Sequence, residues 1–191
     1  RGVDHSDRKT TATLAAGARL VVRERIMTNG EEQAITDFDV LLKGEDSACD
    51  LVSRSVAKGH SYQEFRSWIR GENRCTGHSE CDAILADEGR VNASPALEAS
   101  NIDAALIHEA AIGKIAGEQI LKLCTLGLTK EEAEEQIISG FLKLFSIVTR
   151  TPPAAAGGVV GREVNGTAGR RSGPGGRYPP PWEGGRRHSP G

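Results

Sequence analysis

The amino-acid sequence predicts a mainly β domain that is followed by a short helical region and a disordered tail. Three observations support this prediction: apolar and polar residues alternate with a period of two, turn dipeptides recur between the alternating segments, and a helix-capping pattern begins at Thr129. No strong helical pattern interrupts the alternating segments, so a doubly wound α/β fold is not expected. A β-sandwich and a β-helix both fit this periodicity, which does not distinguish them.

Short strands are predicted from Thr10 to about Ala104. In the clearest one, every second residue of 20–26 is suited to one buried face, which is the period of a half-buried strand. The other predicted strands are 35–42, 51–57, 62–69 and 81–86. Glycine-containing turn signals separate them at Asn29-Gly30, Lys43-Gly44, Lys58-Gly59, Arg70-Gly71 and Glu88-Gly89. Their spacing is typical of an all-β domain.

Two short helices joined by a tight turn are predicted after about Ala104. The first helix would end at Gly127, a residue that often follows a helix C-terminus. Its apolar face would be formed by Ile115, Ile120, Leu121, Leu123 and Cys124. The second helix would begin at Thr129, whose hydroxyl and the carboxylate of Glu132 can cap each other's backbone N–H groups. Its apolar stripe would be formed by Ala133, Ile137, Phe141, Leu144 and Phe145.

The last part of the sequence is predicted to be disordered. Residues 151–191 contain 11 Gly and 7 Pro, and apolar residues are sparse there. These changes of composition divide the chain into a β core at 1–103, a helical region at 104–146 and a tail at 147–191. Because the chain begins with Arg1 and has no apolar leader, we expect the β core to be truncated at its N-terminus.

The bulk properties exclude several functional classes. A net charge of −2 gives no reason to expect nucleic acid as a partner, and no run of about 18 apolar residues suggests a membrane span. Four cysteines are too few for a disulfide scaffold, so reduced thiols in a cytoplasmic protein are expected. A disulfide between Cys75 and Cys81 is the alternative.

The densest group of possible metal ligands lies between Cys75 and Cys81 and includes His78 and Glu80. Thiolate, imidazole and carboxylate are the groups that bind zinc or iron. On a continuous strand, however, the two cysteines face one side and His78 faces the other, so the three converge only if a turn intervenes at Thr76-Gly77. Without that turn, Cys81 would be a buried core residue and His78 an exposed one.

A second pair, His108-Glu109, stands where the β region meets the helices. In isolation such a pair is more often a charge pair at a helix start than a site. The chain contains no nucleophile elbow, no phosphate-binding P-loop and no Ser-His-Asp arrangement in a usable order. An enzyme is therefore not predicted.

Several motifs in order strongly resemble the C-terminal half of the SufB/SufD family of iron–sulfur cluster assembly scaffolds. The matching runs are Gly77-His-Ser-Glu-Cys-Asp-Ala-Ile-Leu85, Ile107-His-Glu-Ala-Ala-Ile-Gly-Lys-Ile115, Glu118-Gln-Ile120, Gly127-Leu-Thr-Lys-Glu-Glu-Ala133 and Ile137-Ile-Ser-Gly-Phe141. The resemblance covers 55–143, and the tail matches nothing in the family. It implies a right-handed parallel β-helix followed by a short helical domain.

The resemblance also implies partners and a cargo. Members of this family form a complex with a second family member and with SufC, an ABC-type ATPase, which would dock on the helical region 104–146. The implied cargo is iron and a transient iron–sulfur cluster, expected to be of the 4Fe–4S type. Position 107 holds Ile where SufB has a glutamate, and in this respect the chain is similar to compact single-type proteins of archaea and some anaerobic bacteria. Those proteins serve as homodimers, and a SufB/SufD-like heterodimer is the alternative.

The family's site residues carry over unevenly. Cys81 falls on the position of the SufB cysteine that receives sulfur or ligates the cluster, and His108 and Glu109 fall on the last two residues of the SufB Glu-His-Glu motif. The first Glu of that motif is Ile107 here, so one carboxylate ligand is absent. The resemblance therefore implies Cys81, His108 and Glu109 as ligands, and the spacing argument above adds Cys75 and His78 as further candidates. A SufD-like subunit that binds iron only transiently through His108 is the alternative, whereas a carbohydrate-active β-helix enzyme is disfavoured by an aromatic content of 4%.

Overall fold

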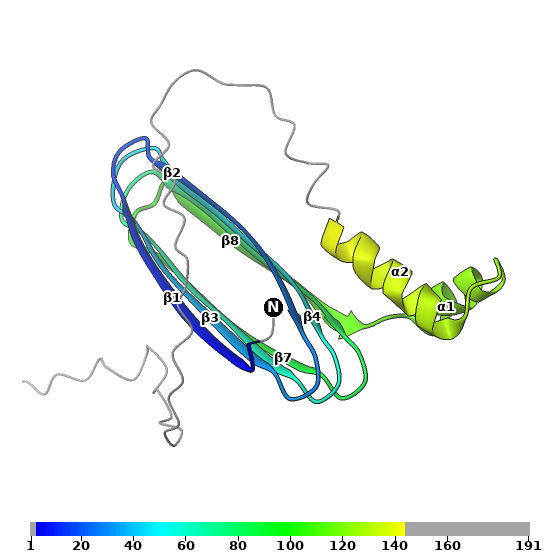
Figure 1. Ribbon diagram of the computed structural model, residues 1–191. Coiled ribbons are helices and arrows are strands. Elements are labelled where there is room, and N and C mark those ends of the chain that lie inside the picture. The colour runs from blue at the N-terminus through cyan, green and yellow to red at the C-terminus, as the bar shows by residue number, and fades with distance from the viewer. Residues whose placement is uncertain (1–2, 144–191) are drawn as a thin grey trace, which may run out of the picture.

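A computed structural model describes residues 3–143 as a flattened parallel β-helix that ends in two helices (Figure 1). Eight strands alternate between two sheets, so that each pair of strands makes one turn and the chain makes four turns. The strands are β1 (His5–Leu14), β2 (Arg19–Thr28), β3 (Gln33–Leu42), β4 (Ser47–Ala57), β5 (Tyr62–Gly71), β6 (Cys75–Leu85), β7 (Arg90–Ala99) and β8 (Ala104–Lys114). The predicted parallel β-helix is confirmed, and the β-sandwich is excluded for these residues.

The two sheets have the strand orders β1-β3-β5-β7 and β2-β4-β6-β8, and every neighbouring pair is parallel. Residues paired across neighbouring strands lie 28 or 29 positions apart, as His5 does from Gln33 and Gln33 from Tyr62. Side chains in register therefore form columns that run from turn to turn. Because successive residues of a strand point to opposite faces, each column lies wholly inside the β-helix or wholly outside it.

The interior has an apolar half and a polar half. The apolar half is a cluster of fully or almost fully buried side chains that includes Leu14, Phe38, Val40, Leu42, Cys49, Leu51, Phe65, Ile69 and Cys75. Burial of this cluster is the main favourable contribution to stability, since each large apolar side chain contributes about 1.5–3 kcal/mol when removed from water.

The polar half consists of hydroxyl and amide groups that bond to one another. The Gln63 amide donates to the Thr28 hydroxyl and to the Val56 carbonyl at 2.8 Å each, and Thr28 donates to Ser61 at 2.8 Å. A buried carboxylate, Glu24, accepts from Ser53 at 2.8 Å and forms an ion pair with Arg8. Buried polar groups satisfied in this way cost little and fix a single side-chain arrangement.

The helices are α1 (Gly117–Cys124) and α2 (Lys130–Lys143). The predicted capping box is confirmed: the Thr129 N–H donates to Glu132 at 2.8 Å, and the Glu132 N–H donates to the Thr129 hydroxyl at 3.2 Å. Helix α2 packs against β4 on the outer face of the β2-β4-β6-β8 sheet, with Ala133 and Ile138 as its buried residues. Ile138 rather than Ile137 is thus the more deeply buried of the two, whereas α1 buries no residue.

The helical region begins later than the sequence suggested. Residues 104–114 form β8, the last strand of its sheet, and α1 begins only at Gly117, so Ile115 lies outside it. The reason is that residues 104–114 pair with β6 in parallel register, and this pairing outweighs the helix propensity of the four alanines in 104–111. Strands β1 and β7 are also absent from the predicted set. Leu144, Phe145 and the tail predicted at 147–191 lie outside the described residues. Neither helix within 3–143 is long and apolar enough to cross a membrane.

The corners between strands are stacked so closely that some of them require glycine. Gly30 and Gly59 both have positive φ angles, of 61° and 68°, and occupy equivalent corners of successive turns. A Cβ atom on Gly59 would lie 2.7 Å from the backbone nitrogen of Gly30, whereas a Cβ atom on Gly30 would meet nothing within 4 Å.

We expect Gly59→Ala to destabilise the protein more than Gly30→Ala. Both substitutions incur the cost of a left-handed alanine, about 1–2 kcal/mol, but only Gly59→Ala adds a backbone clash of about 1–3 kcal/mol. Denaturant unfolding of the two variants measures the difference in the free energy of unfolding. Equal losses would show that the corners are not stacked as described.

Candidate functional site

Strand β6 carries the first group of predicted ligands on two opposite faces. Cys75 and Cys81 point into the β-helix and are buried, whereas His78 points outward and is partly exposed. The strand is continuous from Cys75 to Leu85, so no turn at Thr76-Gly77 brings the three side chains together. The group is therefore not a single metal site within one chain.

Cys81 lies deep in the interior of the third turn, with only 1% of its surface exposed. In register it stands between Ser53 of β4 and Ala110 of β8. Burial, with a smaller contribution from the Asp82 carboxylate, raises the pKa of the Cys81 thiol to about 11. The group is a neutral thiol at physiological pH, and a metal that binds it must displace the proton.

His108 projects from β8 into the same interior as Cys81. It is paired in register with Ser79, two residues before Cys81, so the two side chains are diagonal neighbours on adjacent strands. Its Nδ1 atom is buried and has no hydrogen-bond partner among the described residues. Burial is the main cause that lowers the pKa of His108; His78 adds to the effect, and the backbone of Ser79 and the Glu109 carboxylate oppose it. A neutral imidazole with an unused nitrogen is suited to bind a metal.

Glu109 lies on the opposite face of β8 from His108 and does not share a face with Cys81 or His108 in one chain. It stands directly opposite Glu80 of β6 on the outer face, and Asp82 lies beside them. Burial, followed by the effect of Glu80, raises the pKa of Asp82 to about 6. Arg54 of β4 compensates part of this negative charge, with contacts of 3.4 Å to Glu80 and 3.6 Å to Asp82.

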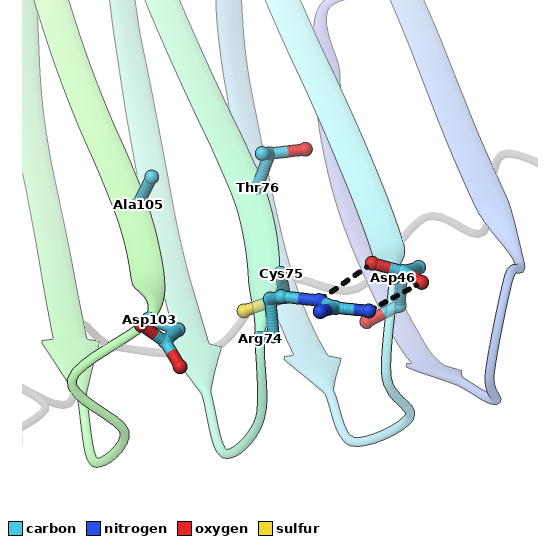
Figure 2. A pocket seen from close by; sticks show the side chains of 7 residues that line it. Asp46, Arg74, Cys75, Thr76, Asp103 and Ala105 are labelled. Atoms are coloured by element: carbon cyan, nitrogen blue, oxygen red, sulfur yellow. Dashed lines mark hydrogen bonds and ion pairs between the residues drawn. The ribbon is translucent and has the colours of Figure 1, made fainter.

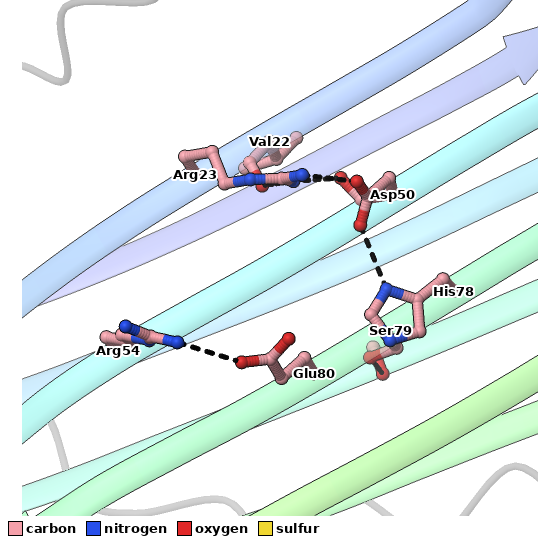
Figure 3. A network of polar contacts seen from close by, with 8 residues as sticks. Val22, Arg23, Asp50, Arg54, His78, Ser79 and Glu80 are labelled. Atoms are coloured by element: carbon pink, nitrogen blue, oxygen red, sulfur yellow. Dashed lines mark hydrogen bonds and ion pairs between the residues drawn. The ribbon is translucent and has the colours of Figure 1, made fainter. Parts of the chain in front are cut away.

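His78 belongs to the network of polar contacts on this sheet that Figure 3 shows. Its Nδ1 lies 2.9 Å from an Asp50 carboxylate oxygen, and Arg23 forms an ion pair with the other oxygen of Asp50. Arg23 and then His78 hold the pKa of Asp50 below its usual value against the effect of burial. The roles of Asp50 and Arg54 were missed, although the 28-residue spacing from Asp50 to His78 and from Arg54 to Asp82 is visible in the sequence.

Cys75 lies at the other end of β6, beside an open hollow of about 350 Å³ (Figure 2). The wall of this hollow includes Arg74, whose guanidinium pairs with both Asp46 carboxylate oxygens at 2.9 and 3.0 Å. This pairing joins two successive corners. Cys75 is itself packed against the apolar half of the core, so it is not a co-ligand of Cys81 in this conformation.

All four cysteines are free, which excludes the alternative of a Cys75–Cys81 disulfide. Three or more His, Cys, Asp or Glu side chains arranged to hold a metal are not found within residues 3–143. Of the predicted ligands, one chain thus brings together Cys81 and His108. Glu109 and His78 lie on the outer face, and Cys75 lies at the far end of the strand.

Comparison with known proteins gives a consistent result. Residues 6–141 match the family model described as "SUF system FeS cluster assembly, SufBD core domain". An iron–sulfur cluster assembly SufBD family protein of Methanothermobacter thermautotrophicus is 37% identical over 131 residues, which is 66% of this chain and 32% of the relative. Relatives with the same description are 38% identical over 105 residues in Archaeoglobus fulgidus and 30% identical over 121 residues in Galdieria sulphuraria. The match to the Archaeoglobus relative covers 54% of this chain and 28% of the relative, and the match to the Galdieria relative covers 61% of this chain and 55% of the relative. The chain spans about a third of the length of the archaeal relatives that it matches.

We expect alkylation to distinguish Cys124 from the other three cysteines. Cys124 is half-buried on α1, whereas Cys49, Cys75 and Cys81 are buried, and burial raises the pKa values of the Cys49 and Cys81 thiols to about 12 and about 11. Iodoacetamide at pH 8 should therefore modify Cys124 at least about tenfold faster, because it reacts with accessible thiolates. Peptide mass spectrometry over time measures the four rates, and Cys124→Ser is the control for peptide assignment. Comparable rates for Cys81 and Cys124 would contradict the described burial.

Proposed function

The chain belongs to the SufBD family of iron–sulfur cluster assembly proteins, and from that premise we propose that it is a scaffold subunit that holds a nascent cluster at a subunit interface. Its role in this proposal is to bind iron and sulfide rather than to catalyse a reaction. The cluster is cargo that the scaffold binds transiently, and we expect it to be of the 4Fe–4S type. A cytoplasmic or similarly reducing compartment is part of the proposal, because the ligand must remain a thiol.

The observation that carries the proposal is that Cys81 and His108 share one interior face in the last two turns. Thiolate is the soft ligand that iron–sulfur clusters prefer, and imidazole binds iron more weakly. A mixed pair of this kind suits a scaffold that must release what it has assembled. The buried and unpartnered Nδ1 of His108 supports the same role, since an unused polar atom in an interior is costly.

Iron cannot reach Cys81 in the described conformation, because 1% of the residue is exposed. Cluster binding therefore requires the last turn to open. Strand β8 covers one side of Cys81 and is the outer strand of its sheet among residues 3–143, so its outer edge is the part that can move or pair with a second chain. We accordingly assign the interface to the β7–β8 end of the β-helix. Leu97 and Ile112 there face the interior yet are 39% and 40% exposed, so a second chain could cover them.

A second protomer at this end would supply the ligands that one chain lacks. Glu109 faces outward and Ile107 replaces a carboxylate, so one chain offers a thiol and an imidazole on the inner face and a carboxylate on the outer one. A homodimer or a SufB/SufD-like heterodimer brings a second set of the same groups. Cys75 and His78 enter the proposal only as ligands toward such a partner.

A SufD-like subunit that binds iron only transiently through His108 is the second candidate. The burial of Cys81 favours it, because such a subunit needs no accessible thiol. The absence of a carboxylate at position 107 also weakens the ligand set. The two candidates differ in whether sulfide is retained on this chain.

We expect Cys81→Ser to abolish cluster reconstitution while leaving the fold intact. Serine is nearly isosteric with cysteine and would lie among the hydroxyls of Ser53 and Ser79. The free energy of unfolding should therefore change by less than about 1.5 kcal/mol. Iron and acid-labile sulfide measured after anaerobic reconstitution give the cluster yield, and circular dichroism gives the fold. Cys124→Ser is the matched control and should reconstitute normally.

An unchanged cluster yield in Cys81→Ser would refute the assignment of Cys81. The SufD-like candidate predicts instead that the unmodified chain retains iron but little sulfide, and that His108→Ala removes that iron.

The helical region is the proposed docking site of a SufC-type ABC ATPase. Helix α1 buries no residue. The side chains of Leu121, on α1, and Leu126, just after it, are 66% and 74% exposed. Two exposed leucines this close in the sequence fit an apolar surface that a partner would cover. Of the region 104–146, we assign partner docking only to the part after β8, because residues 104–114 belong to the β-helix.

We expect Leu121→Glu to weaken binding of a SufC-type ATPase at least about tenfold, because a charge would be buried in an apolar contact. Ile102→Glu is the matched control, since Ile102 is 99% exposed in the corner before β8 and lies away from α1. Copurification quantified by mass spectrometry, followed by titration of the purified ATPase, measures both variants. Equal binding by Leu121→Glu and the unmodified chain would exclude α1 from the docking surface.

A further inference from the structure

The side chain of Arg54 contacts both helix α2 and β6, the strand that carries Cys81. Arg54 is on the outer face of β4, and its side chain is only 18% exposed. Its guanidinium carbon lies 5.6 Å from the centre of the Phe141 ring on α2, within the range of a cation–π contact. The same guanidinium contacts Glu80 and Asp82 of β6, at 3.4 and 3.6 Å. These two carboxylates are the residues immediately before and after Cys81.

The carboxylates need this cation. Glu80 stands directly opposite Glu109 across the β6–β8 ladder, and like charges in that position repel. Asp82 is paired with Arg54 in register and also lies beside Glu80. Arg54 therefore offsets repulsion between β6 and β8, the two strands that enclose Cys81 and carry His108.

Helix α2 limits the positions that Arg54 can take. Phe141 covers the guanidinium on one side, and a second contact, from Lys58 to Glu134 at 3.0 Å, holds the same helix against β4. Toward the ends of β6 and β8, a hollow of about 410 Å³ separates Phe141 from residues such as Ile84 and Gly113. Arg54 thus links α2 to the outer face around Cys81, and Phe141 lines the hollow beside this link.

We infer that Arg54 is a positioning residue that couples the seating of α2 to the closure of the β6–β8 ladder over Cys81. When Phe141 withdraws, Arg54 becomes more solvated and its contacts with Glu80 and Asp82 weaken. The repulsion between Glu80 and Glu109 is then less compensated, and β8 separates more readily from β6. This inference rests on the proposed function only for what the exposed thiol does.

The ratio of alkylation rates at Cys81 and Cys49 tests this coupling in the full chain. Both thiols are buried in the apolar cluster of the interior, with Cys81 1% and Cys49 4% exposed, but Cys81 is on β6, which pairs with β8, whereas Cys49 is on β4, which does not. Global unfolding exposes both and leaves the ratio unchanged, whereas local opening of β8 exposes Cys81 alone. Iodoacetamide labelling followed by peptide mass spectrometry gives both rates in one sample.

We expect Arg54→Met to raise the Cys81/Cys49 rate ratio about tenfold, since methionine keeps an apolar stem and loses every charged contact. Phe141→Leu, which keeps apolar volume and loses the ring face, should raise the ratio about threefold to tenfold. Phe141→Tyr keeps the ring and should leave the ratio at its original value. Lys58→Met removes the contact to Glu134 and loosens α2 without touching the carboxylates of β6, so it should raise the ratio less than Arg54→Met does and add nothing when combined with Arg54→Met.

An unchanged ratio in Arg54→Met would overturn the inference. So would a further rise when Lys58→Met is added to Arg54→Met, because loosening of α2 would then act on β8 without Arg54. Labelling uses neither iron nor sulfide, so its outcome is independent of cluster reconstitution. Failure of the Cys81→Ser test would remove the scaffold assignment and leave the coupling of α2 to β8 standing.

Discussion

The alternation of side chains along stacked parallel strands is the constraint on which the rest of this structure depends. Each strand has one inner and one outer face, and the register between turns holds every column on its face for the length of the β-helix. The apolar core, the hydroxyl-lined half of the interior and the charged outer network all follow from it. So does the division of the predicted ligands, since neighbours in the sequence such as His108 and Glu109 are necessarily on opposite faces.

Much of the fold was predictable from the sequence because its signals are local. The alternation in β2 and the capping box at Thr129 depend on residues within a few positions of each other. The order of motifs after 55 identified the family and through it the β-helix, which periodicity alone left undecided. Strand β8 was placed in the helical region because its small residues carry little β propensity of their own; its conformation is imposed by pairing with β6.

The site was predictable in part. Strand geometry already separated His78 from the two cysteines, and the continuity of β6 confirmed that separation. The depth at which Cys81 is buried was not predictable, since it depends on how two sheets and four turns pack around it. The partners of the outer carboxylates were missed for a related reason. Arg54 is 28 positions from Asp82 and 87 from Phe141, and only the turn spacing and the return of α2 bring them together.

The turn spacing of 28 or 29 residues has a consequence for how such a chain can change over evolutionary time. The odd residue is absorbed at a corner, so the strands on either side keep their faces. Losing one residue inside β6 upstream of the thiol would instead exchange Cys81 for Asp82 in the interior and turn every following side chain of that strand inside out. Length variation among related chains should accordingly gather at the corners, while the strands diverge by substitution alone.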